Sequence, residues 1–204
     1  MRGSSKVRFE LEASLAAILL LILSPLLLTI ILLIRLDSPG PAIFRQTRLG
    51  KDLQPFTFFK FRTMYQDARQ RFPELYDYGT APAAEGDFLF KQPKDPRVTR
   101  IGRWLRRTGL DELPNLINVM KRDCGFVGPR PDIPEIVSHY SASQRIRFSV
   151  PQGLFCLAHI MGASRLTFTQ TAELDTEYAL RRSLWLDLRI LARVPATILK
   201  GQLH

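Results

Sequence analysis

The stretch AAILLLILSPLLLTIILLIR, residues 16–35, decides how this chain meets its surroundings. As a helix it would be roughly 30 Å long, about the hydrocarbon thickness of a bilayer. Pro25 offers no N–H to the carbonyl of Leu21, and its ring clashes with that turn. The hydroxyl of Ser24 can bond back to the carbonyl of Leu20 or Leu21 and offset part of this loss. The stretch is therefore predicted to be a helix broken at Ser24 and Pro25.

Positive charge flanks both ends of this hydrophobic stretch, with Arg2, Lys6 and Arg8 before it and Arg35 after it. Positive residues prefer the cytoplasmic side of a membrane. A broken helix that enters one leaflet and returns satisfies this preference twice, whereas a kinked spanning helix satisfies it once. The residues alone leave both topologies open. A cleaved secretory signal is disfavoured, because no small-residue cleavage site follows.

The composition points to anionic partners. The chain has 204 residues and a formal net charge of +10. This balance favours phospholipid head groups, nucleotide phosphates or nucleic acid. The two cysteines, Cys124 and Cys156, give neither a disulfide framework nor a metal-binding C-x-x-C spacing. A reducing, cytoplasmic setting is the simpler interpretation.

The remaining pattern predicts an α+β fold, with the hydrophobic helix segment at residues 1–36 and a globular domain at residues 37–204. Alternating phenylalanines predict a small β-hairpin, and apolar residues at helical spacing predict several helices. The expected elements are two strands in residues 42–64 around a turn at 50–52, a loop at 72–94, helices at 98–110, 113–120, 134–147 and 167–199, and a strand leading into a rigid loop at 125–134. The later part of the last helix is basic and carries Trp185, which suits a membrane surface or core packing equally.

An acidic pair, Asp111 and Glu112, lies between basic segments. The arginines before it are Arg97, Arg100, Arg103, Arg106 and Arg107, and Gly128-Pro129-Arg130-Pro131 follows it. Acids in a first helical turn often serve only as capping groups, because the helix dipole favours them. Arginine forks and helix N–H groups, however, also suit phosphate.

The same pattern therefore also favours a phosphate ester bridged to the two carboxylates by Mg²⁺. A carboxylate can act as the nucleophile in phosphoryl transfer. His139 and His159 are alternative bases, but a structural role is expected for both.

The segment KDPRVTRIGRWLRRTGLDELPNLINVMKRDCGFVGPRP, residues 94–131, resembles the core of the bacterial sugar transferase family, the monotopic polyprenyl-phosphate phosphoglycosyl transferases. Further motifs of that family are matched in the same order by GPAIFRQTRLGKDLQPFTFFKFRTM (40–64), QGLFCLAHIMG (152–162) and SLWLDLRILARVPATILKG (183–201). The resemblance covers most of the chain and implies the minimal, single-domain form of the family.

The resemblance implies a specific reaction. A sugar 1-phosphate passes from a UDP-sugar to polyprenyl phosphate, usually undecaprenyl phosphate, and gives a polyprenyl-diphosphate sugar and UMP. This is the first membrane step of glycan or exopolysaccharide assembly. Asp111 matches the family's nucleophile, which carries a phosphosugar-aspartyl intermediate in a ping-pong mechanism.

Other site residues follow from the same resemblance. Asp111 and Glu112 are expected to hold Mg²⁺, and Arg106 matches an arginine that meets the phosphate. The residues expected to line the substrate site are Lys60, Arg62, Arg130 and Pro131. The resemblance also implies a re-entrant helix, broken at Ser24-Pro25, with both ends at the cytoplasmic face of the bacterial inner membrane.

Three departures from the family pattern lie near the acidic pair. Gly109 stands where serine is usual, Lys121-Arg122-Asp123 replaces Lys-Gly-Asp, and Cys124-Gly125-Phe126 replaces Met-Ser-Leu or similar. They bear on substrate preference and efficiency more than on reaction type. The alternative to an enzyme is a membrane-tethered lipid- or nucleic-acid-binding protein, which the positive charge alone allows. Such a protein would not need the acidic pair, so no nucleic-acid partner is expected; a homo-oligomer is possible.

Overall fold

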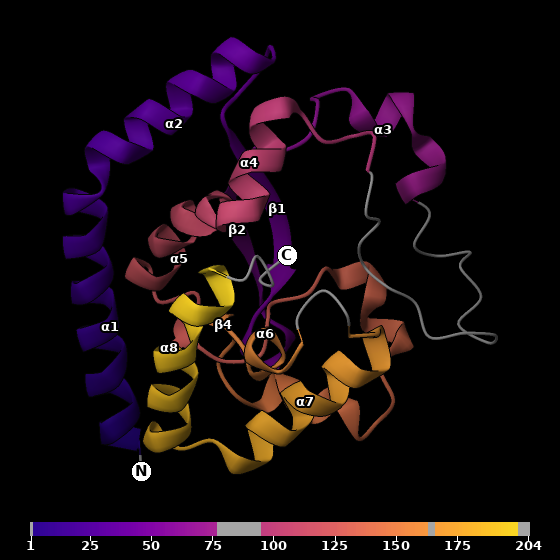
Figure 1. Ribbon diagram of the computed structural model, residues 1–204. Helices are drawn as coiled ribbons and strands as arrows, with labels where there is room; N and C mark the ends of the chain where they lie inside the picture. The colour runs from indigo at the N-terminus through magenta and orange to yellow at the C-terminus, as the bar shows by residue number, and fades with distance from the viewer. Residues whose placement is uncertain (1, 77–94, 163–165, 200–204) are drawn as a thin grey trace.

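The computed structural model describes residues 2–76, 95–162 and 166–199. Along the chain, with 3-10 helices written η, the elements are α1 (Arg2–Ile22), α2 (Ser24–Asp37), β1 (Ile43–Leu49), η1 (Lys51–Leu53), β2 (Pro55–Phe61), α3 (Ala68–Arg71), η2 (Pro73–Tyr76), α4 (Arg100–Thr108), η3 (Leu110–Asn115), α5 (Leu116–Met120), β3 (Gly125–Val127), η4 (Pro134–His139), η5 (Gln144–Ser149), β4 (Gly153–Phe155), α6 (Leu157–Met161), α7 (Phe168–Arg181) and α8 (Leu184–Leu199). The mixture of helices and two small sheets confirms the predicted α+β class. In Figure 1, α1 and α2 run along one side of the body formed by the other elements.

The hydrophobic stretch is broken where the sequence predicts. Only Leu23 separates α1 from α2, and the two helices are bent by 63°. The Ser24 hydroxyl donates to the carbonyl of Leu21 at 2.7 Å, which is the predicted compensation for the N–H that Pro25 lacks. No single described helix has the length and hydropathy of a membrane span, but the bent pair has them together.

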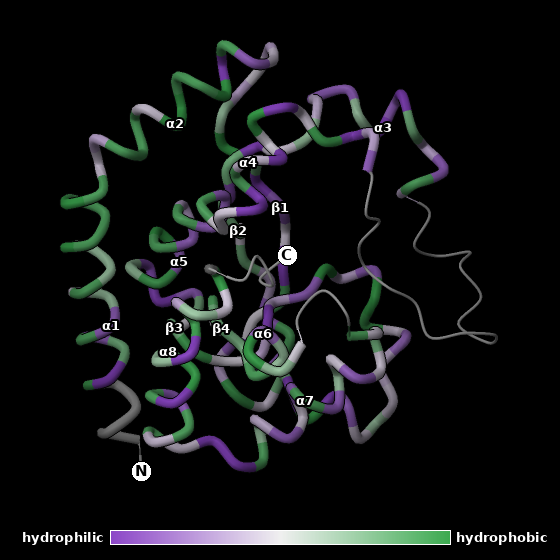
Figure 2. Tube along the Cα trace, in the orientation of Figure 1, coloured by the Kyte–Doolittle hydropathy of each residue, from purple (hydrophilic) through white to green (hydrophobic). Residues whose placement is uncertain are grey.

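One side of the bent pair packs on the body and the other is exposed. Ala16 of α1 belongs to a core cluster with Leu116, Val119, Cys124 and Leu154, and α2 contributes Ile30 and Ile34 to a cluster with Ala42, Phe61 and Leu105. The exposed large apolar residues of the pair are Val7, Leu11, Leu15, Ile18, Leu21, Ile22, Leu26, Leu28, Leu32, Leu33 and Leu36. Figure 2 shows hydrophobic colour along most of α2 and the adjoining half of α1. An exposed hydrophobic surface of this extent marks an interaction site for a membrane or another apolar partner.

The predicted hairpin is confirmed. Strands β1 and β2 are antiparallel, with a register that runs from Ile43 opposite Phe61 to Leu49 opposite Pro55. The connection turns through Asp52 and Leu53, whose φ angles are 54° and 60°. The hairpin is covered on both faces, because Phe58 and Phe61 point to opposite sides and both are buried.

The helix predictions succeed at the start of the body and fail later. The basic helix expected at 98–110 is α4. Of the helix expected at 113–120, only α5 is α-helical, and the 3-10 helix η3 with Pro114 inside it precedes α5. The single helix expected at 134–147 is wrong, since η4 and η5 take its place. The reason is local: the Ser141 hydroxyl accepts from the Gln144 N–H at 3.3 Å and starts a new turn.

The last expected helix is also wrong as a single element. Arg182 is extended, with φ −49° and ψ 123°, and separates α7 from α8. The Ser183 hydroxyl then accepts from the N–H of Leu186 at 3.2 Å, as a residue before a new helix does. The hydrophobic periodicity of 167–199 continues across this break, so it gave no sign of two helices.

A second sheet supports the loop that carries Arg130. Strands β3 and β4 are parallel, with Gly125 opposite Gly153 and Val127 opposite Phe155. A Cβ on Gly153 would lie 2.1 Å from the backbone nitrogen of Gly128, so only glycine allows this approach. The N–H of Gly153 donates to the carbonyl of Pro129 at 2.9 Å. The start of the Gly128–Pro131 loop is therefore fixed to β4 by main-chain contacts.

Candidate active site

Asp111 is placed by the end of α4. Gly109 ends that helix with φ 71°, a left-handed conformation that glycine adopts without a Cβ penalty. The chain then continues as η3, which carries Asp111 and Glu112. Asp111 is only 3% exposed. The glycine that departs from the family pattern is thus the residue that turns the chain into the acidic pair.

Glu112 joins three elements through its carboxylate. Its Oε1 accepts from Nζ of Lys60 on β2 and from Nη2 of Arg130 after β3, each at 2.5 Å. Its Oε2 accepts from Nδ2 of Asn115 at 2.5 Å. Burial lowers the pKa of Lys60 although Glu112 and Asp111 oppose that effect. For Arg130, burial is the largest single effect and acts to lower the pKa, but the charge and hydrogen bond of Glu112, with the charges of Cys156 and Asp111, together outweigh it and raise the pKa.

Arg106 approaches the same acidic pair from α4. Its Nε donates to the hydroxyl of Thr63 at 3.0 Å, and its Nη1 lies 4.0 Å from Oδ2 of Asp95. Burial lowers the pKa of Arg106, against the opposing charges of Asp111 and Asp95. The charge of Asp111 also acts to raise the pKa of Lys60 and of Arg130. Arg106, Lys60 and Arg130, from three separate segments, are therefore all subject to the charge of the buried Asp111.

Arg62 and Pro131 are not brought to the acidic pair by any contact of the described structure. Arg62 is buried, and its guanidinium donates to the carbonyls of Pro39 and Ser38, the latter at 2.7 Å, at the end of α2. Pro131 contributes its carbonyl to Nη1 of Arg48 at 3.0 Å. Their assignment to the substrate site stays a prediction, and the geometry gives Arg62 a place at the end of the hydrophobic helix pair.

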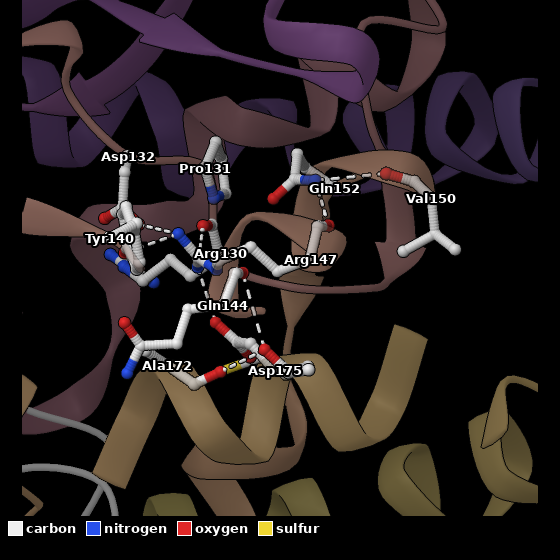
Figure 3. Close-up of polar contacts among 12 residues, drawn as sticks. Arg130, Pro131, Asp132, Tyr140, Gln144, Arg147, Val150, Gln152, Ala172 and Asp175 are labelled. Carbon is white, nitrogen blue, oxygen red and sulfur yellow. Dashed lines mark hydrogen bonds and ion pairs between the residues drawn. The ribbon is translucent and has the colours of Figure 1, made fainter. Parts of the chain in front are cut away.

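A buried network behind Arg130 was not predicted from the sequence (Figure 3). Arg147, 1% exposed, donates through Nη2 to the carbonyl of Arg130 at 2.8 Å and to Oδ2 of Asp175 at 2.5 Å. Its Nη1 donates to Asp132 and to the hydroxyl of Tyr140. The network joins η5, α7 and the Gly128–Pro131 loop, so it fixes the main chain from which Arg130 reaches Glu112. Arg147 stands in a segment of mixed polarity, QRIRFS (144–149), so the sequence gave no sign of its burial.

Two asparagines were also missed. Asn115 is fully buried and holds Glu112 as described above. Asn118, also fully buried, accepts from the N–H of Phe59 at 3.1 Å and donates to the carbonyl of Thr57 at 2.6 Å. It therefore ties α5 to the strand that carries Lys60. Both lie on the inner side of the segment after the acidic pair, and spacing alone does not separate them from solvent-exposed amides.

The two histidines make packing and capping contacts, and Nε2 of His159 also lies 3.4 Å from Nη1 of Arg130, so a purely structural role for both stays a prediction. His139 packs edge-on against Phe168, with ring centroids 6.4 Å apart. His159 accepts through Nδ1 from the N–H of Cys156 at 3.2 Å, within the capping box at the start of α6. Both cysteines are buried and free, and burial raises the pKa of each thiol.

The donor set fits Mg²⁺ only together with a ligand. No group of three or more histidine, cysteine or carboxylate side chains able to hold a metal occurs among the described residues. Asp111 and Glu112 offer two adjacent carboxylates, and Mg²⁺ is commonly bound by one or two carboxylates plus substrate phosphates. Because Glu112 already meets Lys60 and Arg130, a metal at this position would share that carboxylate with two cations.

A carboxylate pair with one buried member, in contact with lysine and arginine and beside a bent apolar helix pair, defines a site for phosphate esters at a hydrophobic surface. Comparison with known proteins is specific. The model of the family described as bacterial sugar transferase matches residues 4–201. The chain therefore belongs to the bacterial sugar transferase family, and the resemblance found in its motifs is confirmed.

Relatives carry names that describe sugar-phosphate transfer. The UDP-glucose:undecaprenyl-phosphate glucose-1-phosphate transferase of Caulobacter vibrioides is 39% identical over 197 residues, covering 93% of this chain and 68% of that protein. The Escherichia coli protein of the same name is 38% identical over 200 residues, covering 92% of this chain and 38% of that protein. The galactosyl transferase CpsE of Streptococcus agalactiae is 37% identical over 169 residues, covering 82% of this chain and 36% of that protein. The chain thus spans between about a third and two thirds of these relatives.

Proposed function

We propose that this protein transfers a sugar 1-phosphate from a UDP-sugar to polyprenyl phosphate. The observation that carries the proposal is the buried Asp111 beside Glu112, whose carboxylate binds Lys60 and Arg130 at 2.5 Å each. A nucleoside diphosphate sugar brings two negative phosphates, and these cations offset that charge while the carboxylate remains close to phosphorus. The family membership and the names of the relatives support the same reaction.

The reaction has two displacements. A carboxylate oxygen of Asp111 attacks the sugar-bearing phosphorus, the bond to the UMP oxygen breaks, and UMP leaves. An oxygen of the lipid phosphate then attacks the same phosphorus, and the aspartate is released as the diphosphate bond forms. Arg106 and Arg130 are assigned to the phosphate oxygens, because guanidinium groups match them with paired donors. Lys60 and Asn115 hold Glu112 beside the nucleophile.

The residues proposed to hold Mg²⁺ are Asp111 and Glu112, together with the donor diphosphate. When bound, the ion would neutralise charge on the phosphate oxygens. Lys60 and Arg130 must then share Glu112 with it. Metal dependence is tested by assaying UMP release after chelation and after return of Mg²⁺.

The bent helix pair is proposed to be re-entrant, with both ends at the cytoplasmic face of the inner membrane. Its 63° bend, its exposed apolar side and the positive charge at both ends support this topology. Single cysteines introduced near the two termini and labelled with a membrane-impermeant reagent test it. Shared accessibility supports re-entrance, and opposite accessibility would establish a span. Cys124 and Cys156 are buried, so their background labelling is expected to be small.

The covalent step is tested without the lipid acceptor. Purified protein is mixed with a labelled UDP-sugar, quenched rapidly, digested and examined by mass spectrometry. The expected result is a sugar-phosphate adduct on the peptide that contains Asp111, with one UMP released per adduct. Asp111→Asn should form no adduct, whereas Asp67→Asn, which changes an exposed acid on another segment, should form it normally. A folded Asp111→Asn protein that turns over would refute the assignment.

A further inference from the structure

The outer face of α4 is basic and has no assigned role. Arg100, Arg103, Trp104 and Arg107 are all exposed, and Trp104 is 44% exposed. Their spacing of three and four residues places them on one side of the helix. Within the part of the chain that the structure describes, none of these three arginines forms an ion pair or a side-chain hydrogen bond. Three unpaired guanidinium groups around an exposed indole need an anionic partner from outside the chain.

The two flanks of α4 show where this face lies. Ile101, on one flank, packs with Ile30 and Ile34 of α2, and its N–H donates to Oδ2 of Asp37 at 3.0 Å. Arg106, on the other flank, donates to the hydroxyl of Thr63, and the charge of Asp111 acts to raise its pKa. Because successive residues of a helix are about 100° apart, the exposed face lies between these flanks. It therefore connects the hydrophobic helix pair to the nucleophile.

The chemistry of the face matches a lipid that ends in a phosphate. Arginine forks bind phosphate oxygens, and an indole suits the boundary between lipid and water. The neighbouring end of α2 is apolar and open, with Leu36 75% exposed next to the Asp37 that touches α4. A soluble nucleotide has no apolar chain to pack against that border, whereas a polyprenyl phosphate has one.

The geometry points to this face as the binding surface for the polyprenyl phosphate acceptor, whose phosphate would meet the arginines of α4 before it reaches Asp111. This inference rests on the proposed function. It adds the route of the second substrate, and it separates the lipid-binding arginines from Arg106 and Arg130. The acceptor's prenyl chain would lie along the exposed side of α2.

A triple substitution tests the surface. Arg100, Arg103 and Arg107 are changed together to Gln, and the control changes three exposed arginines of other elements, Arg69, Arg145 and Arg181, to Gln. The first triple should raise KM for the acceptor about tenfold or more, because several charge-assisted contacts are lost. KM for the UDP-sugar and adduct formation without lipid should stay as in the wild type. The control should leave all three quantities unchanged.

The other outcomes overturn the inference. An unchanged acceptor KM would do so, as would an equal rise in the control triple, which would show an effect of bulk charge. A rise in KM for the UDP-sugar alone would assign the surface to the donor. Failure of the wild type to form the adduct would instead contradict the proposed function, so the two failures are distinguishable.

A binding measurement gives a readout besides activity. The chain has two tryptophans, so Trp185→Phe leaves Trp104 as the single one. Its fluorescence should change saturably when undecaprenyl phosphate is added to the protein in phosphatidylcholine nanodiscs. The change should be lost with the triple arginine variant. An equal response to the same mole fraction of phosphatidylglycerol would overturn the assignment to the acceptor, since the surface would then bind anionic lipids in general.

Discussion

Replacing Asp175 by Asn is expected to leave the protein at least as stable at neutral pH, although it removes one partner of a buried ion pair. Arg147 is the single guanidinium between Asp132 and Asp175, and Tyr140 also faces it. Among the described residues no group donates to Oδ1 of Asp175, and the residue is 0% exposed. Burial raises the pKa of Asp175 to about 6, although Arg147 opposes the shift.

The size of the effect follows from that pKa. Between pH 3.8 and about 6 the folded protein binds a proton that the unfolded chain has lost, so the free energy of unfolding falls as the pH rises through this window. The shift of about two units corresponds to at most about 3 kcal/mol. Asparagine stays neutral and keeps an oxygen for Arg147, so the variant avoids this loss. In a chain of this size the difference is roughly 6–12 °C in Tm.

The assay is thermal unfolding in detergent at a series of pH values from 4 to 8, for wild type and Asp175→Asn. The wild type should lose stability between pH 4 and 6 relative to the variant, and the two curves should run parallel above pH 7. Arg147→Met is the contrasting variant, since it leaves two buried carboxylates without their cation and should cost about 3–5 kcal/mol. A large destabilisation by Asp175→Asn at pH 7.5 would show that the ion pair outweighs burial, and would refute the reasoning.

Four further substitutions test local features of the fold by thermal unfolding and UMP release. Gly102→Ala would place a Cβ 2.1 Å from the carbonyl oxygen of Thr63, so it should lower the free energy of unfolding by about 1–3 kcal/mol and reduce activity by shifting α4; unchanged activity would contradict the packing. Gly109→Ser should lower the free energy of unfolding by about 1 kcal/mol, because serine carries a Cβ at φ 71°. Arg122→Gly should leave stability unchanged or raise it, because it removes a Cβ at φ 65°. The reverse order of stabilities would refute the argument that left-handed φ angles favour glycine at these positions. Asn118→Ala should lower the free energy of unfolding by about 1–3 kcal/mol, because it removes the partner of the Phe59 N–H and the Thr57 carbonyl of β2, and a neutral result would show that water replaces the amide.

Local chemistry explains which parts of the fold the sequence predicts. The break at Ser24-Pro25 follows from one missing N–H and one hydroxyl, and the hairpin follows from alternation of phenylalanines over seven residues. The strand expected before the rigid loop at 125–134 is β3, but its partner β4, three residues long, was not predicted, and the two are joined by close contact of two glycines. That contact depends on segments 25 residues apart, which no local pattern records.

The candidate site divides in the same way. Asp111, Glu112, Lys60, Arg106 and Arg130 come from motifs, and the structure brings them together. The supporting groups Asn115, Asn118, Arg147 and Asp175 were missed, because their importance comes from burial. An arginine with 1% exposure and one on the surface look alike in a sequence. Burial is decided by the packing of distant elements, so only the structure separates them.

The position of Arg62 has a consequence for how the enzyme responds to its membrane. Lys60 and Arg62 are two residues apart. Lys60 donates a hydrogen bond to Glu112, whereas Arg62 donates to the carbonyls at the end of α2. A change in the tilt of α2 should therefore shift the same short segment that holds Glu112 beside Asp111. The turnover rate should therefore depend on the acyl-chain length of the phospholipids in reconstituted bilayers, although these lipids contact none of the reacting atoms.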